Sequence, residues 1–156
     1  MAAPSATPSP TGSAAAKNSQ IAALQGALAA EHAAVYGYGV VGAMTSGAQR
    51  AAARSDWTAH QVARDTLETM LTGLGATPVA ASAAYQLPFA VTSGKTAVRL
   101  AASLEDGVTR AYLGVVAVTD PALRSFGAKA MQTAAGRALA WTGTTQAFPG
   151  MRATQP

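Results

Sequence analysis

The sequence of 156 residues is long enough for one domain with a buried core, and it contains no cysteine. The lack of cysteine excludes a disulfide framework, thiolate zinc sites, iron–sulfur clusters and cysteine nucleophiles. Eleven basic and seven acidic residues give a net charge of +4. Because the basic residues are scattered and form no run, we expect no nucleic-acid partner.

The composition is typical of a soluble all-α protein, because the chain is rich in alanine and only 6% aromatic and 12% charged. The longest uncharged stretch, residues 33–49, is too short and too mixed to span a bilayer, so we expect no membrane contact. The N-terminus has no basic region before an apolar segment, which argues against a secretory signal. These features predict a cytoplasmic location.

The first predicted helix runs from about Gln20 to Met44. Residues 1–17 are rich in proline, serine, threonine and alanine and are predicted to form a disordered tail. Asn18 or Ser19 can cap the helix, and Thr45-Ser46-Gly47 interrupts it. Its apolar stripe consists of Leu24, Leu28, Val35 and Tyr38.

The second predicted helix runs from about Ala48 to Leu74 and should pack antiparallel to the first across a short turn. Residues 75–91 follow, with two prolines and no sustained period, and they predict a structured crossover. A crossover of this length can reach about 50 Å, enough to run the length of a helix of about 25 residues. Helices two and three can therefore be parallel.

The third predicted helix begins near Thr92 or Ser93 and ends by Thr119. Asp120-Pro121 starts the fourth, because a carboxylate cap followed by proline at the first helical position is a strong start signal. A short turn, a long crossover and a second short turn predict a ferritin-like four-helix bundle over residues 18–150. Residues 151–156 are left as a C-terminal tail.

Several charged side chains lie on the apolar faces of these helices. Glu31 continues the stripe of the first helix, and His60 lies on the inner face of the second. Glu105 falls on the apolar face of the third helix and Arg137 on that of the fourth, while Arg64 lies one turn after His60. Two buried carboxylates need a positive partner, which can be a metal ion or a guanidinium group.

A di-metal bundle needs a Glu from each of two helices and a Glu-x-x-His motif from each of the other two. Glu31 and Glu105 supply the two single carboxylates. The motifs are defective, because the second helix offers Trp57-x-x-His60 and the fourth offers Ala134-x-x-Arg137. The sequence therefore predicts a degenerate di-metal site that lacks two carboxylates and one imidazole.

Two interpretations of this site stay open. In the first, Arg64 and Arg137 pair with Glu31 and Glu105, His60 adds a hydrogen bond, and no cofactor is present. In the second, Glu31, His60 and Glu105 hold one iron, manganese or zinc ion. We favour the first, in which the five residues form a buried polar network with no catalytic or metal-binding residues.

Five segments together resemble an actinobacterial ferritin-like family of unassigned function. They are AALQGALAAEHAAVYGYGVVGA, W-x-x-H-x-x-x-R-D, AYQLPF, LEDGVTRAY and RALAWTGTTQAFPG. The resemblance covers roughly residues 21–150 and implies a ferritin-like fold in a bacterial cytoplasm. It implies no activity, and fold alone does not give function.

The sequence thus favours a non-catalytic binding or interaction module, with a protein partner or a homo-oligomer as the expected assembly. A mononuclear metal-binding protein or oxidoreductase using Glu31, His60 and Glu105 is the alternative. Binding of a small ligand inside the bundle is a third possibility.

Overall fold

The computed structural model describes residues 10–144, and within them the chain is entirely helical apart from its connections. The helices are α1 (Pro10–Met44), α2 (Gly47–Gly73), α3 (Gly94–Val116) and α4 (Pro121–Thr142). They pack as a bundle, and the described part of the chain contains no strand, which confirms the predicted all-α fold class. None of the described helices is both long and apolar enough to cross a membrane.

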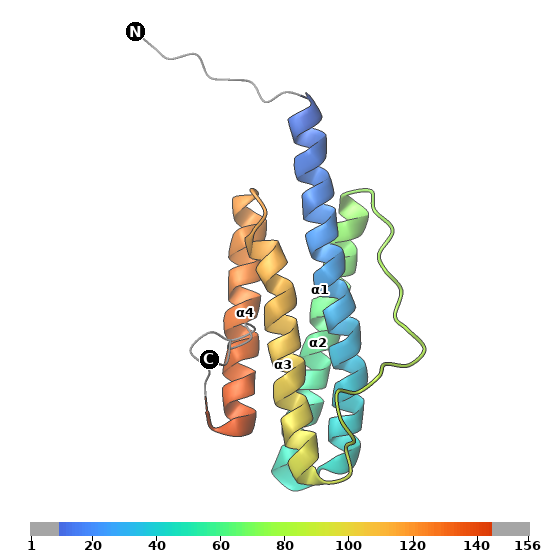
Figure 1. Cartoon of the computed structure of the whole chain (residues 1–156), viewed down its shortest axis with the longest axis vertical. Helices are drawn as coiled ribbons and strands as arrows, with labels where there is room; N and C mark the ends of the chain where they lie inside the picture. The colour runs from blue at the N-terminus through green and yellow to red at the C-terminus, as the bar shows by residue number, and fades with distance from the viewer. Residues whose placement is uncertain (1–9, 145–156) are drawn as a thin grey trace, which may run out of the picture.

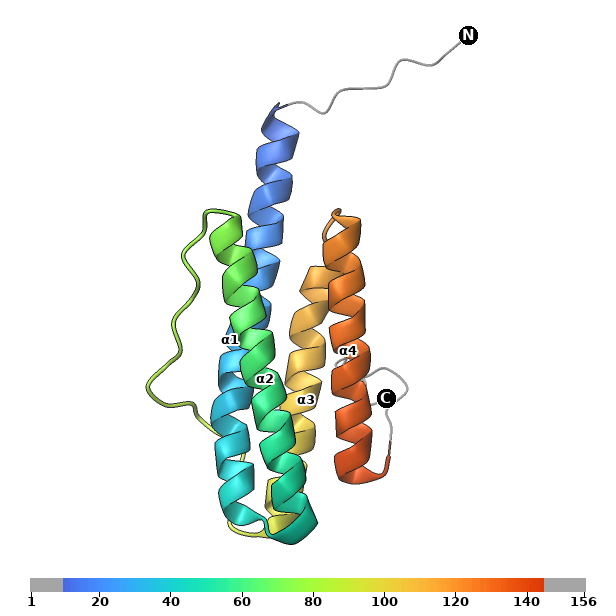
Figure 2. The same cartoon turned by 180° about the vertical axis from the view of Figure 1, so that it is seen from behind.

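The connectivity is the predicted one. Thr45-Ser46 joins α1 to α2, and residues 117–120 join α3 to α4. Residues 74–93 form the long crossover, which runs along the outside of α1 and α2 from one end of the bundle to the other (Figures 1 and 2). Helices α2 and α3 are consequently parallel, and α1 and α4 run in the opposite direction.

Helix α1 begins earlier than predicted, at Pro10 instead of Gln20. Residues 10–17 of the predicted tail are therefore helical. The first turns of α1 project beyond the ends of the other helices (Figure 1). Proline suits the first position of a helix, and Ala14, Ala15 and Ala16 favour the helical conformation, so these turns continue the packed part of α1. The rest of the predicted tails, residues 1–9 and 151–156, lies outside the described residues.

The starts of α3 and α4 follow the capping signals in the sequence. The Ser93 side chain accepts from the Thr96 amide, and the Thr96 side chain accepts from the Ser93 amide, which completes a capping box. Asp120 accepts from the Leu123 amide at 2.8 Å, with Pro121 in the first turn. Helix α4 ends at Thr142, where Gly143 adopts a left-handed φ of 69° that glycine tolerates without strain.

The crossover is tied to the bundle by both polar and apolar contacts. The Gln25 side chain on α1 donates to the Thr77 carbonyl and accepts from the Val79 amide. Leu87 and Phe89 pack against a core cluster around Tyr38 and Leu100. The segment therefore covers the outside of the bundle, as its apolar residues predicted.

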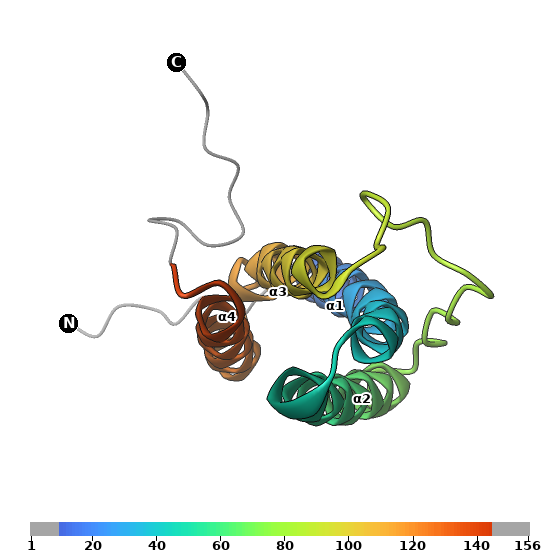
Figure 3. The ribbon, with the colours of Figure 1, turned by 90° about the horizontal axis from the view of Figure 1, so that it is seen from below.

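The helices form an arc in the order α2, α1, α3 and α4 (Figure 3). Adjacent members of this arc pack extensively, but α2 and α4, at its two ends, do not. We call the boundary between them the α2–α4 seam. The core lies on the concave side and includes Leu28, Leu67 and Val115.

One glycine allows α4 to approach α3 closely. A Cβ atom at Gly127 would lie 3.1 Å from Cβ and Cγ1 of Val115, closer than ordinary van der Waals contact. Both of these Val115 atoms belong to a stiff, branched side chain that cannot swing aside. The contact between α3 and α4 thus depends on the absence of a side chain at this position.

Replacing Gly127 with valine should lower the free energy of unfolding by about 1 to 3 kcal/mol through overpacking. The matched control is Gly136→Val on the same helix, because Gly136 is exposed and a Cβ there would meet nothing within 4 Å. The control should change the free energy by about 0.5 kcal/mol at most. Urea denaturation followed by circular dichroism measures both, and equal effects would contradict the close approach.

Candidate functional site

Five buried side chains from three helices form one continuous chain of hydrogen bonds in the centre of the bundle. His60 on α2 lies between Glu31 on α1 and Glu105 on α3, and all three are at most 2% exposed. Tyr38 and Tyr112 close the two ends of this chain. We call these residues the central network: Tyr38, Glu105, His60, Glu31 and Tyr112.

Both ring nitrogens of His60 contact a carboxylate. Nδ1 lies 2.6 Å from Glu31 Oε2, and Nε2 lies 3.0 Å from Glu105 Oε1. An ionised carboxylate can only accept hydrogen bonds, so with both glutamates ionised both nitrogens donate and the ring carries two protons. His60 is therefore an imidazolium held between two carboxylates.

The electrostatics of the site agree with this protonation. Burial disfavours the charged ring, but the hydrogen bonds to Glu105 and Glu31 and the charges of both groups outweigh it, raising the pKa of His60 to about 9. The imidazolium ring also stacks on Tyr38, with ring centroids 5.1 Å apart. The positive charge on α2 is thus fixed in place by groups from α1 and α3.

The two tyrosine hydroxyls complete the network by donating to the carboxylates. Tyr38 donates to Glu105 Oε1 at 2.6 Å, and Tyr112 donates to Glu31 Oε1 at 2.9 Å. Burial, followed by the charge of the neighbouring carboxylate and the hydrogen bond to it, raises the pKa of both tyrosines well above the usual value. Both hydroxyls therefore keep their protons and act as hydrogen-bond donors.

The predicted pairing of the glutamates with arginine is wrong. Arg64 contacts Asp65, its neighbour in sequence, and its side chain is 28% exposed. Arg137 contacts Asp56 on α2, with Nε 3.3 Å from Oδ1. Imidazolium supplies the positive charge instead, because His60 projects directly between the carboxylates, whereas the longer arginine side chains reach other acidic partners.

The other positions of the degenerate motifs contribute no ligand. Ala134 is buried in the apolar core, where a metal-binding bundle would have a carboxylate, and Trp57 is partly exposed on α2. His32, adjacent to Glu31, instead places Nε2 3.0 Å from the Val79 carbonyl of the crossover. Helix α4 thus supplies no hydrogen-bonding member of the central network.

Tyr38 and Tyr112 are network residues that the sequence interpretation did not assign to the site. Both belong to the apolar stripes of their helices, so the periodicity identified them as inward-facing. The signal that could have found them is chemical, because a buried tyrosine hydroxyl needs a partner and the nearest inward-facing acceptors were the two glutamates.

The central network does not fit a di-metal or mononuclear centre as it stands. The His60 ring has no free lone pair, and Glu31, His60 and Glu105 point at one another instead of at a common point. Among residues 10–144, no group of three or more His, Asp or Glu side chains is arranged to hold a metal ion. One acceptor is left over, since Glu105 Oε2 is buried without a hydrogen-bond partner.

A pocket of about 400 Å³ opens on the α2–α4 seam and reaches the central network. We call it the seam pocket. Glu31 and Tyr112 lie among its lining residues, together with side chains from α2, α3 and α4. The others are Ala59, Val62, Ala63, Thr66, Val108, Phe126, Lys129, Ala130, Thr133 and Arg137.

Asp56 bridges the seam beside this pocket. It accepts from Trp141 Nε1 at 2.9 Å and pairs with Arg137, so two side chains of α4 meet one carboxylate of α2. Arg137 lines both the seam pocket and a second pocket of about 360 Å³ that also contains Asp56 and Trp141. The bridge thus separates two openings along one seam.

Comparison with known proteins places the chain beside others without an assigned activity. The model of a family described as "Domain of unknown function (DUF4439)" matches residues 23–153. The crystal structure of a conserved hypothetical protein, Rv2844, from Mycobacterium tuberculosis is 35% identical with a TM-score of 0.78. That match covers 81% of this chain and 96% of the mycobacterial one. A search of the curated proteins found no match.

The free energy of unfolding should fall as the pH rises from about 6.5 to about 9. The ordinary pKa of histidine, 6.5, applies to the unfolded chain, whereas the folded pKa is about 9. Below pH 6.5 the ring is protonated in both states and the stabilisation is complete, and above pH 9 it is lost. The difference corresponds to about 3 kcal/mol.

Urea denaturation at a series of pH values measures this dependence. The His60→Gln variant should lose most of it, while His32→Gln, which removes the other histidine of the chain, should keep it. A wild-type stability that stays flat across this interval, or an equal fall in His60→Gln, would contradict the imidazolium assignment.

Proposed function

This chain belongs to the family described as a domain of unknown function, DUF4439, and we propose its function from the geometry of its own site. We propose that the protein is a non-catalytic binding module that takes a ligand in the seam pocket. In this proposal the central network is structural and stands in place of the metal centre of other ferritin-like bundles. The observation that carries it is that carboxylates engage both His60 nitrogens, while one of these carboxylates, Glu31, also lines an open pocket.

The state of the titratable groups supports a non-catalytic role. A general base needs a free lone pair near neutral pH, but the protonated His60 ring offers none. The raised pKa values of Tyr38 and Tyr112 keep both hydroxyls neutral and bonded to carboxylates. Each proton of the network is thus already placed between two buried groups, which stabilises the fold.

The seam pocket supports a binding role. Its volume of about 400 Å³ lies within the range of roughly 300 to 1,000 Å³ that small-molecule sites occupy. It combines apolar walls with a few polar groups, as such sites do, and it forms where two helices of the bundle are not packed together. The ligand would lie against Glu31 and Tyr112.

One observation favours the alternative of a mononuclear iron, manganese or zinc protein. Glu105 Oε2 is a buried acceptor without a hydrogen-bond partner, and a cation is one way to satisfy such an atom. The alternative requires that His60 lose a proton and that Glu31 and Glu105 turn toward a common point. Each change breaks a hydrogen bond of the central network, so we rank this alternative second.

Elemental analysis separates the two proposals. Protein purified without a histidine tag should contain far less than one equivalent of iron, manganese or zinc, because the imidazolium already compensates the carboxylates. The Glu31→Ala variant and the surface control Asp65→Ala should give the same low content. Stoichiometric metal in the wild type that is lost in Glu31→Ala and kept in Asp65→Ala would establish the alternative.

A blocking substitution tests the binding role. Nile red, an uncharged dye that brightens in apolar surroundings, should bind the wild type, and Ala63→Phe should abolish binding by filling the seam pocket. The matched control is Ala29→Phe, which places the same ring at an exposed position of α1 outside the pocket. Circular dichroism checks folding. No dye binding to the wild type, or equal binding to both variants, would reject the pocket as the site.

The expected protein partner or homo-oligomer stays a prediction, as does the cytoplasmic location. Sedimentation of the full chain at several concentrations tests self-association. A wild type that sediments as a monomer throughout would remove the homo-oligomer and leave the ligand-binding proposal unaffected.

A further inference from the structure

We propose that the seam pocket takes an amphipathic organic cation, an ammonium group carried on an apolar or aromatic body. This inference rests on the proposed function, because it names the ligand class of the same pocket. It follows from the balance of buried and exposed charge around the pocket, from its aromatic lining and from the hydrogen bonds that its hydroxyl groups already make.

The buried charges around the pocket sum to a negative value. Glu31, Glu105 and the His60 imidazolium contribute two negative charges and one positive. Arg137 also lines the pocket, but it pairs with Asp56 just outside the lining, so this pair carries no net charge. One negative charge remains. If the ring were neutral, one carboxyl group would have to hold the proton to donate to the second ring nitrogen, and the sum would still be one negative charge. The sign is therefore the same in either protonation state of the ring.

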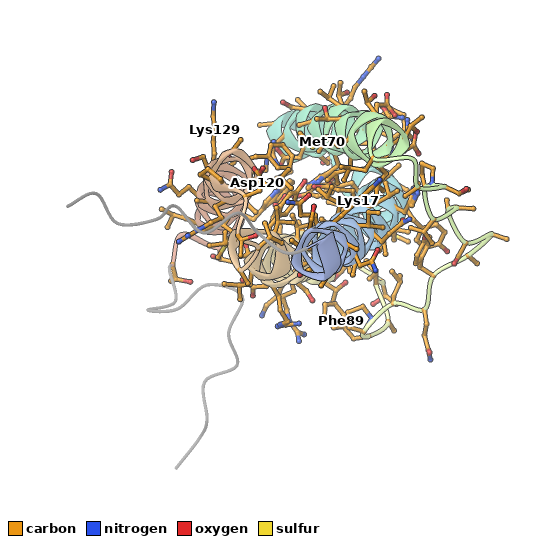
Figure 4. The ribbon with its side chains drawn as sticks, turned by 90° about the horizontal axis from the view of Figure 1, so that it is seen from above. Lys17, Met70, Phe89, Asp120 and Lys129 are labelled. Carbon is orange, nitrogen blue, oxygen red and sulfur yellow. The ribbon has the colours of Figure 1, made fainter. Side chains whose placement is uncertain are left out.

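The only other charged residue that lines the seam pocket is Lys129, and it lies on the rim. Its side chain is exposed and extends outward from α4 (Figure 4). At equal distance, a charge pair near a protein surface interacts about four times more strongly than one in bulk water. Glu31 is 2% exposed, so its charge is screened far less than that of Lys129.

The lining residues offer few free hydrogen-bond donors to an anionic ligand. The hydroxyl of Thr66 donates to the Val62 carbonyl at 2.8 Å, and that of Thr133 donates to the Lys129 carbonyl at 3.0 Å. Tyr112 donates to Glu31. The side-chain hydroxyls of the lining therefore all have their protons engaged, and an anionic group would find only Lys129 and the Arg137 side chain that Asp56 already holds.

The same lining suits an ammonium group. Tyr112 and Phe126 lie edge to face with ring centroids 5.8 Å apart, beside Glu31 on the pocket wall. Aromatic rings attract a desolvated cation through their quadrupoles, and a carboxylate supplies the opposite charge. The alanines of α2 and α4, Ala59, Ala63 and Ala130, leave space for the apolar part of the ligand.

Three probes with the same tail test the charge preference: decylammonium, decanol and decanoate, each titrated against bound Nile red. Decylammonium should displace the dye at a concentration about tenfold or more lower than decanol or decanoate requires, because it gains a charge-assisted contact. The Glu31→Gln variant, which removes the charge and keeps the shape, should remove this preference. Lys129→Gln should leave it unchanged or increase it.

The outcomes separate the two proposals. If decanoate or decanol bound most tightly, and Ala63→Phe abolished that binding, the preference for a cation would be overturned. The seam pocket would remain a binding site. A preference for decylammonium that survives Glu31→Gln in folded protein would also overturn the inference. Should Glu31→Gln not fold, the order of the probes on the wild type and on Lys129→Gln decides. If neither Nile red nor any of the three probes bound, both the proposed binding role and the proposed cation preference would be overturned.

Discussion

The pairing of one imidazolium with two buried carboxylates is the interaction on which the bundle depends. Glu31, His60 and Glu105 come from α1, α2 and α3, so each of these helices must keep its register for the hydrogen bonds to form. An isolated buried charge costs several kcal/mol, and each member of this set is acceptable only because the others are present. The central network therefore fixes how three of the four helices pack.

Helix α4 supplies no member of the hydrogen-bonded chain, although its Trp141 and Phe126 pack on the rings of Tyr38 and Tyr112. Ala134 and Arg137 occupy the positions where a di-metal bundle would send two ligands inward from α4. Without such ligands, no central charge draws α4 toward α2. The two helices instead meet through Asp56, and the space beside that bridge is the seam pocket.

The sequence predicted the fold and the inward faces well, because apolar periodicity, capping residues and loop lengths are local signals. It placed Glu31, His60 and Glu105 on core faces, and the structure brings their side chains together. It failed for Arg64 and Arg137, since periodicity locates the start of a side chain and not the end of a long one. The early start of α1 was missed because composition alone does not separate a helix from a tail.

The two carboxylates of the central network differ in their access to the seam. Glu31 lines the seam pocket, whereas Glu105 is completely buried and lies against Tyr38. A ligand can therefore meet one carboxylate, while the other anchors the imidazolium from the far side. Such a division would let the interior keep its stabilising charge pair during binding, because the group that faces the ligand is held by Tyr112 and His60 on both of its oxygens.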